Sequence, residues 1–203
     1  MRRPEFIARQ SGKPEGLLGR IIAFIMERET VEQNRRALAA LEIEDGDDVL
    51  ELGYGHGRTL EAIGALTPSG RIAGIDHSEE MHDLASRRCD ALLGAGRVDL
   101  RAGDTRRLPY PDRSFSRALA VHLLYFWSDP LEHLREVHRV LRDGGRFVIA
   151  FRDKSDPGAA DFPPPLYTFY ETGMVRRLLA EAGFRATETV DDSPGFTIVR
   201  ALR

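Results

Sequence analysis

The chain is predicted to fold as an α/β protein with a seven-stranded, mostly parallel sheet, helices on both faces and a C-terminal antiparallel hairpin. From residue 49 onward, short apolar runs alternate with amphipathic stretches. Such alternation favours parallel strands joined by right-handed helical crossovers. The last two apolar runs, about 185–190 and 196–201, are separated by a short turn around Pro194-Gly195, and this spacing favours a hairpin.

The expected elements follow from local signals. In the first half, helices are expected over 21–26 and 31–41, with Thr30 as the N-cap of the second. The glycine-rich strand that begins near residue 49 is followed by a helix over 59–66, a strand over 71–76 and a helix that runs from the cap Ser78 toward 93. In the second half, strands are expected over 98–102, 115–121 and 147–151. Between the last two, a helix begins at Asp129-Pro130 and ends at Asp143-Gly144-Gly145, and a further helix covers 174–182.

Size, charge and cysteine content restrict the class of protein. The chain has 203 residues, of which 42% are hydrophobic and 30% charged, which is typical of one soluble domain. A net charge of −3 provides no basic field for nucleic acid. The single cysteine, Cys89, fits a reducing compartment, and the most apolar run, 17–26, is too short to cross a bilayer. We expect a cytoplasmic monomer or homodimer without nucleic-acid or membrane partners.

A glycine-rich turn between the first strand and its helix is the strongest functional signal. The pattern is Glu51-x-Gly53-x-Gly55-x-Gly57. Alternate glycines permit positive φ and leave no Cβ to hold a ligand away from the main chain, and a following helix adds unpaired N–H groups. The dinucleotide pattern G-x-G-x-x-G places its third glycine one residue later. The turn therefore predicts close contact with a different cofactor.

These residues resemble the first motif of the class I S-adenosylmethionine-dependent methyltransferases. Three later stretches are also similar to that family, and together they extend the resemblance over about residues 47–202: Gly103-Asp104 with Leu108-Pro109, Leu134 to Phe147 with Asp143 in place of the usual proline, and Ala182-Gly183-Phe184. The most similar branch includes quinone-biosynthesis enzymes. The resemblance implies a Rossmann-like fold, S-adenosylmethionine as cofactor and no metal. We expect one domain, with 1–45 as an N-terminal helical lid or cap and 46–203 as the cofactor-binding core.

The cofactor residues are expected at the carboxyl ends of successive strands. Asp76 lies about 20 residues past Gly57, where a carboxylate accepts ribose hydroxyls. The resemblance implies that Glu51 lies near the cofactor's amino group, that Asp104 accepts from the adenine amine and that the Thr105 N–H meets the ring. The complete expected set is Glu51, Gly53, Tyr54, Gly55, Gly57, Asp76, His77, Met81, Asp104, Thr105 and Val121.

Methyl transfer to a small-molecule acceptor needs alignment and exclusion of water more than a universal catalytic group. His122, just after the fourth strand, is the candidate general base, although a histidine there can simply pack or hydrogen-bond. A planar or apolar acceptor is expected to contact His122, Tyr125, Trp127, Arg152, Tyr167 and Tyr170, and Tyr125, Phe126 and Trp127 are expected to line an apolar pocket. The Pro-rich segment around 162–167 and the N-terminal segment are expected to form a lid, with a surface loop and an amphipathic packing helix as the alternative.

The sequence is also compatible with other classes of protein. A nicotinamide-dependent oxidoreductase is disfavoured by the early third glycine and by Asp104. A non-catalytic module would bind S-adenosylmethionine without turnover. Methylation of nucleic-acid base amines is disfavoured because Ala120-Val121-His122-Leu123 stands where those enzymes carry an N/D-P-P-aromatic tetrapeptide.

Overall fold

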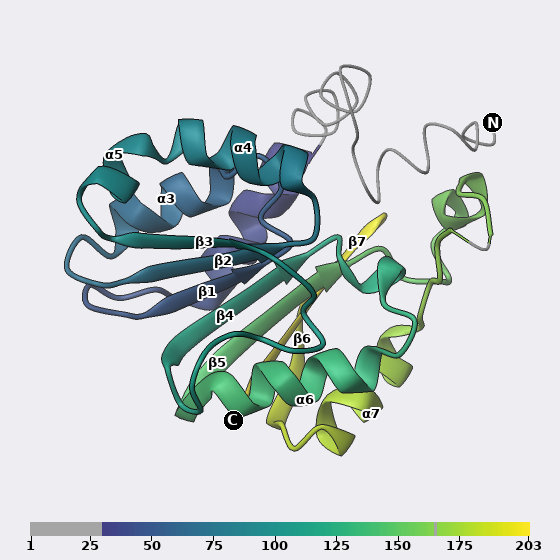
Figure 1. Cartoon of the computed structure of the whole chain (residues 1–203). Coiled ribbons are helices and arrows are strands. Elements are labelled where there is room, and N and C mark those ends of the chain that lie inside the picture. The colour runs from purple at the N-terminus through teal and green to yellow at the C-terminus, as the bar shows by residue number, and fades with distance from the viewer. Residues whose placement is uncertain (1–29, 165) are drawn as a thin grey trace.

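The computed structural model describes residues 30–164 and 166–203, and its centre is a seven-stranded sheet (Figure 1). The strand order is β3-β2-β1-β4-β5-β7-β6. The strands are β1 (Val49–Leu52), β2 (Ile72–Asp76), β3 (Val98–Ala102), β4 (Phe115–Val121), β5 (Leu141–Phe151), β6 (Arg185–Ser193) and β7 (Phe196–Leu202). The helix expected over 21–26 lies outside the described residues.

The first five strands are parallel, and the last two form the predicted hairpin. β1 pairs in parallel with β2 and β4, β2 pairs with β3, and β4 pairs with β5. β7 runs antiparallel to both β5 and β6. The strand order reverses between β1 and β4, so the segments that follow these two strands run to opposite faces of the sheet and leave space for a ligand at their carboxyl ends. The predicted fold class is confirmed.

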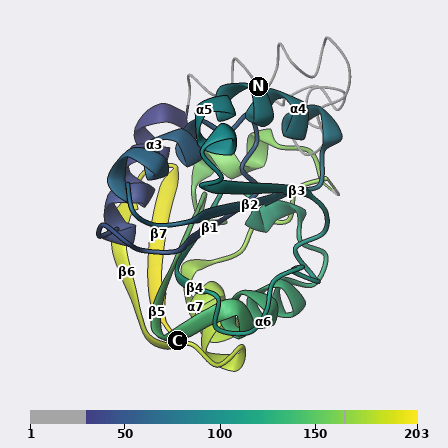
Figure 2. The same cartoon turned by 60° about the vertical axis from the view of Figure 1, so that its left-hand side comes forward.

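Helices cover both faces of the sheet (Figures 1 and 2). One face carries the helix over residues 30–41 together with α3 (Arg58–Leu66), α4 (Glu79–Arg88) and α5 (Asp90–Gly94). The other carries α6 (Pro130–Val140) and α7 (Thr172–Glu181). On this second face Leu108 and Tyr110, from the loop between β3 and β4, join the same core cluster as β1 and β2. Two short 3₁₀ helices, η1 (Leu124–Phe126) and η2 (Pro157–Asp161), follow β4 and β5.

Several element boundaries differ from the sequence prediction, and two of the differences have a cause in contacts between distant segments. The helix expected to run from Ser78 toward residue 93 is divided at Cys89, whose thiol is buried and donates to the carbonyl of Gly57. The second difference is at the end of α6, which stops at Val140 instead of at the glycine pair. Here β5 begins at Leu141, because Gly144 and Gly145 exchange main-chain hydrogen bonds with Arg203. Both boundaries depend on contacts with segments distant in sequence.

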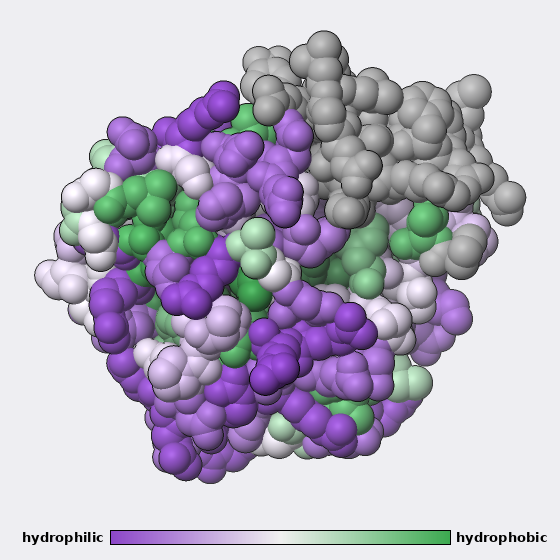
Figure 3. All heavy atoms as spheres, in the orientation of Figure 1, coloured by the Kyte–Doolittle hydropathy of each residue, from purple (hydrophilic) through white to green (hydrophobic). Residues whose placement is uncertain are grey.

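The face drawn in Figure 3 is mostly hydrophilic, with apolar residues in separate patches. Among the described residues, the large hydrophobic side chains that stay exposed are Leu66, Met174 and Val190. Within the same part of the chain, no helix combines the length and apolar character needed to span a membrane.

Candidate active site

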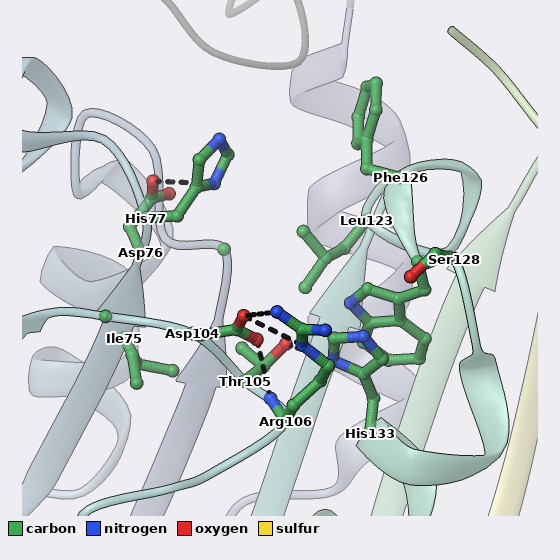
Figure 4. Close-up of a pocket in the computed structure, with 13 residues that line it drawn as sticks. Ile75, Asp76, His77, Asp104, Thr105, Arg106, Leu123, Phe126, Ser128 and His133 are labelled. Atoms are coloured by element: carbon green, nitrogen blue, oxygen red, sulfur yellow. Dashed lines mark hydrogen bonds and ion pairs between the residues drawn. The ribbon is translucent and has the colours of Figure 1, made fainter. Parts of the chain in front are cut away.

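A cavity of about 260 Å³ opens beyond the carboxyl ends of β1, β2, β3 and β4 (Figure 4). Asp76 and His77 stand on one side, Leu123, Phe126 and Ser128 stand opposite, and the loop after β3 forms the floor. The lining residues are Gly53, Ile75, Asp76, His77, Gly103, Asp104, Thr105, Arg106, Leu123, Phe126, Trp127, Ser128 and His133. This is the edge of the sheet at which ligands of open α/β folds bind.

The three glycines of the turn have different surroundings. Gly53, Gly55 and Gly57 all have positive φ, of 70°, 53° and 84°. A Cβ added to Gly57 would lie 2.9 Å from the Ala85 Cβ, so this glycine permits α4 to pack on the turn. A Cβ added to Gly55 would meet no protein atom within 4 Å. The space beside Gly55 is therefore open to a ligand.

The Asp76 carboxylate, at the end of β2, also holds the glycine turn in place. Its Oδ2 accepts from the Gly55 N–H over 2.9 Å, and its Oδ1 accepts from the Ser78 N–H over 2.9 Å. The residue is buried, while the neighbouring His77 lines the cavity with its Nδ1 3.8 Å from Oδ1. Asp76 thus joins the turn, β2 and the start of α4.

Glu51 lies beneath the turn and is buried at 4% exposure. Its Oε2 has no hydrogen-bond partner among the described residues, and Thr59 hydrogen-bonds to its side chain. Burial, together with the negative charge of Asp76, raises the pKa of Glu51 well above its usual value. A carboxyl group with an orphan oxygen beneath the glycine turn fits a ligand that supplies a cationic donor.

The Asp104 carboxylate is paired with Arg106 in the same loop. Arg106 donates through its main-chain N–H to Oδ1 and through Nε and Nη2 to Oδ2, over 2.8, 2.9 and 2.6 Å. The hydrogen bond from this guanidinium lowers the pKa of Asp104, so the carboxylate is charged at neutral pH. Both side chains are about half exposed, so a ligand donor can reach the carboxylate.

His122 follows β4 in a left-handed conformation, with φ of 55°. Its Nδ1 lies 3.2 Å from the Tyr125 hydroxyl and its Nε2 lies 2.7 Å from Oε1 of Gln33, in the helix over 30–41. Burial, reinforced by the positive charge of Arg152, lowers the pKa of His122 to about 4. The imidazole is therefore neutral at physiological pH.

An aromatic cluster extends from η1 to the segment after η2. The rings of Phe126 and Tyr167 have centroids 4.9 Å apart, and those of Tyr125 and Phe169 also lie 4.9 Å apart. Phe162 is 4.9 Å from Tyr167, and the Arg152 guanidinium lies 5.7 Å from the Phe162 ring. Phe126 is the ring of this cluster that lines the cavity, so it presents an apolar wall on that side, with the other rings packed behind it.

The predicted site residues occupy four environments. Those that line the cavity are Gly53, Asp76, His77, Asp104, Thr105 and Trp127. Glu51, Gly55, Gly57 and Val121 belong to the supporting turn and strand, and His122, Tyr125, Arg152, Tyr167 and Tyr170 lie in or beside the aromatic cluster. The side chains of Tyr54 and Met81 are buried, with the Tyr54 hydroxyl 3.0 Å from Nδ1 of His82, and neither residue lines the cavity.

Sequence reasoning missed six of the cavity residues, whereas Phe126, expected beside an apolar pocket, does line the cavity. Arg106, Leu123 and Ser128 are direct neighbours of predicted residues, so extending each motif by one residue would have found them. Ile75 and Gly103 similarly adjoin Asp76 and Asp104. His133 carries no such signal, because its spacing on α6 is that of a core residue. Within the described residues, no group of three or more His, Cys, Asp or Glu side chains is arranged to hold a metal ion.

Comparison with known proteins identifies the family. The methyltransferase domain family matches residues 50–149. An O-methyltransferase of Pyrenophora dematioidea is 31% identical over 179 residues, which are 84% of this chain and 64% of that protein. The ubiquinone/menaquinone biosynthesis C-methyltransferase UbiE of Geotalea daltonii is 31% identical over 133 residues, 65% of this chain and 55% of that protein. An uncharacterised 37.1 kDa protein of a Streptomyces fradiae transposon is 36% identical over 168 residues, 75% of this chain and 48% of that protein. The chain thus spans about half to two thirds of the length of these curated relatives.

The solved structures agree with the sequence comparison. A SAM-dependent methyltransferase from Aquifex aeolicus superposes with a TM-score of 0.70 at 25% identity, covering 83% of this chain and 88% of that one. The chain belongs to the class I S-adenosylmethionine-dependent methyltransferases, as the motifs predicted. The cofactor of this family is S-adenosylmethionine, and the open space beside Gly55 and the orphan oxygen of Glu51 fit such a cationic ligand.

Proposed function

We propose that this protein transfers a methyl group from S-adenosylmethionine to a small, planar or apolar acceptor by in-line displacement. The observation that carries the proposal is the convergence of the open glycine turn, Asp76 and Asp104 on one cavity at the strand ends. A net charge of −3 favours a small molecule over nucleic acid as acceptor.

Each polar group at this edge suits one part of the cofactor. Asp76 would accept the ribose hydroxyls with the lone pairs left by its two main-chain bonds. Asp104 would accept from the adenine amine, and the N–H of Thr105 would meet the ring. Glu51 would face the amino group of the methionine moiety, where its charged form gains a partner.

Bound S-adenosylmethionine supplies a methyl group on a sulfonium: the acceptor atom forms the new bond to carbon while the carbon–sulfur bond breaks and its electron pair stays on sulfur. The protein's main task is then to align the acceptor and exclude water. Phe126, which lines the cavity and packs on Tyr125 and Tyr167, supports an apolar, planar acceptor. His122 would take the acceptor's proton where the acceptor atom carries one.

We further propose that residues 1–45 act as a lid or cap over a core formed by 46–203, together with the Pro-rich segment after η2. Support comes from Gln33, which binds His122, and from Phe162 and Phe169, which pack on the wall of the cavity. Limited proteolysis with saturating cofactor and acceptor should slow cleavage in both segments. Unchanged cleavage would contradict the proposal that these segments form a lid.

The proposal is tested by methyl transfer itself. Purified protein with methyl-labelled S-adenosylmethionine and a panel of phenols, quinols, amines and thiols should label one acceptor class and release S-adenosylhomocysteine. The Asp76→Ala variant is the matched control for background transfer. Cofactor binding without turnover on any acceptor would instead indicate a non-catalytic cofactor-binding module.

A further inference from the structure

One polar residue stands on the otherwise apolar buried face of α6. This face consists of Pro130, His133, Leu134, Val137 and Val140. His133 is 5% exposed, and its position would suit an apolar side chain if packing alone decided. A buried imidazole needs a hydrogen-bond partner, so its contacts indicate its role.

His133 is bound to two residues that also line the cavity. Its Nδ1 lies 2.6 Å from Oγ1 of Thr105, in the loop after β3. Its ring stacks on the indole of Trp127, with centroids 4.6 Å apart and planes 6° apart. Thr105, Trp127 and His133 therefore form one layer at the cavity wall, built from three separate segments. Figure 4 shows Thr105 and His133 together below the mouth of the cavity.

The hydrogen bond from this layer holds Thr105, a loop residue whose main-chain N–H is available to a ligand. Thr105 lies between β3 and β4, where no helix stiffens the chain. Within residues 30–164 and 166–203, the Thr105 N–H donates to no main-chain or side-chain acceptor. The preceding residue, Asp104, contributes an acceptor carboxylate that lines the same cavity. An acceptor followed by a donor complements the edge of adenine, whose amine donates and whose ring nitrogen accepts.

We propose that His133 is a positioning residue for the cofactor: its hydrogen bond holds Thr105 so that the N–H of that residue meets the adenine ring. This inference rests on the proposed function. The physical reason is preorganisation. A loop donor that is already fixed loses less conformational freedom when the ligand binds, so affinity increases without a new contact to the ligand.

Four variants separate the hydrogen bond from the packing. His133→Phe keeps a ring for Trp127 and removes the bond to Thr105. Thr105→Val removes the same bond from the other side with nearly unchanged shape. His133→Asn replaces the ring and keeps an amide near the position of Nδ1. His138→Phe makes the same substitution on the same helix, at a residue that packs on Phe184 instead.

The measurement is the dissociation constant of S-adenosylhomocysteine by calorimetry, with thermal unfolding of each variant in parallel. Trp127 is the chain's single tryptophan, so its fluorescence gives an independent signal from the cavity wall. We expect His133→Phe and Thr105→Val each to weaken binding about tenfold, and the double variant to be no weaker than either single one. His133→Asn should stay within about threefold of wild type, and His138→Phe should bind as wild type does.

Several outcomes would overturn the inference. Wild-type affinity in His133→Phe, additive losses in the double variant, or an Asn variant as weak as the Phe variant would each show that His133 only packs. If His133→Phe does not fold, Thr105→Val still decides the result. If the wild-type protein fails to bind S-adenosylhomocysteine, the proposed function itself fails and this inference falls with it; normal wild-type binding with an unaffected Thr105→Val removes the inference alone.

Discussion

The N–H of Gly55 donates to Oδ2 of Asp76 over 2.9 Å, across the gap between the glycine turn and the end of β2. Sequence motifs single out these two residues separately, each as a contact for the cofactor. In the structure the two residues are hydrogen-bonded to each other, so the Asp76 carboxylate helps to fix the conformation of the turn. A substitution at either residue should therefore also alter the position of the other.

Asp76→Ala is expected to weaken binding of S-adenosylhomocysteine by about 1–3 kcal/mol or more, because it removes the ribose acceptor and leaves the N–H groups of Gly55 and Ser78 unpaired. Asp76→Asn retains one acceptor oxygen and should lose less. Asp99→Ala, at a half-exposed carboxylate on β3 that pairs with Arg101, is the control. Calorimetric affinity equal to wild type in Asp76→Ala would contradict the assignment.

Gly57→Ala should mainly reduce stability, whereas Gly55→Ala should mainly reduce cofactor affinity. At Gly57, the new Cβ would lie 2.9 Å from the Ala85 Cβ at a φ of 84°, so we expect the free energy of unfolding to fall by about 2–4 kcal/mol. At Gly55 the Cβ meets no protein atom, and the conformational cost should be about 1 kcal/mol. Gly55→Ala should instead reduce cofactor affinity, since its methyl group occupies the open space. Denaturant unfolding and calorimetry on both variants measure the two effects, and a Gly55→Ala protein with full affinity would exclude close main-chain approach.

The sheet and its ligand-binding edge were predictable because both follow from local patterns. Strand–helix alternation gave the parallel order, and β3 and β4 were placed with the bounds that the structure has. Element ends were less predictable where a distant segment decides them. The start of β5 at Leu141 depends on main-chain bonds with Arg203, at the other end of the chain.

The site residues show the same difference between local patterns, which were predictable, and contacts with distant segments, which were not. Asp76 was found because it ends a strand, where a parallel sheet presents ligand-binding residues, and Asp104 and Thr105 were found because the motif after the third strand resembles that of the family. His133 was missed because its position on α6 has the periodicity of a core residue, and only the approach of the Thr105 loop gives it a polar partner. Sequence periodicity reports which face is buried, and it does not report what that face meets.

Glu51→Gln tests whether the buried carboxyl group is protonated before the cofactor binds. The folded-state pKa is raised above the unfolded value, so in the wild type stability is lost as pH rises from about 4.5 through the folded pKa. The Gln variant cannot ionise, and its stability relative to wild type should increase over that window in pH-dependent unfolding. In the wild type, a cationic ligand beside Glu51 should release a proton, measurable by calorimetry in buffers of different ionisation enthalpy. Equal proton release in Glu51→Gln would assign the proton to another group.

His122→Ala should lower turnover more than cofactor affinity if His122 accepts the acceptor's proton. Because burial lowers its pKa to about 4, the neutral imidazole persists well below the usual 6.5, and the acid limb of the wild-type kcat/KM profile should lie near pH 4. Tyr125→Phe removes the partner of Nδ1 without touching the imidazole, so it is the matched variant for the surrounding hydrogen bonds. It should keep the same acid limb with a smaller loss of rate. A pH–rate profile of His122→Ala with the shape and height of the wild-type profile would remove the catalytic role and leave His122 as the residue that ties η1 to Gln33.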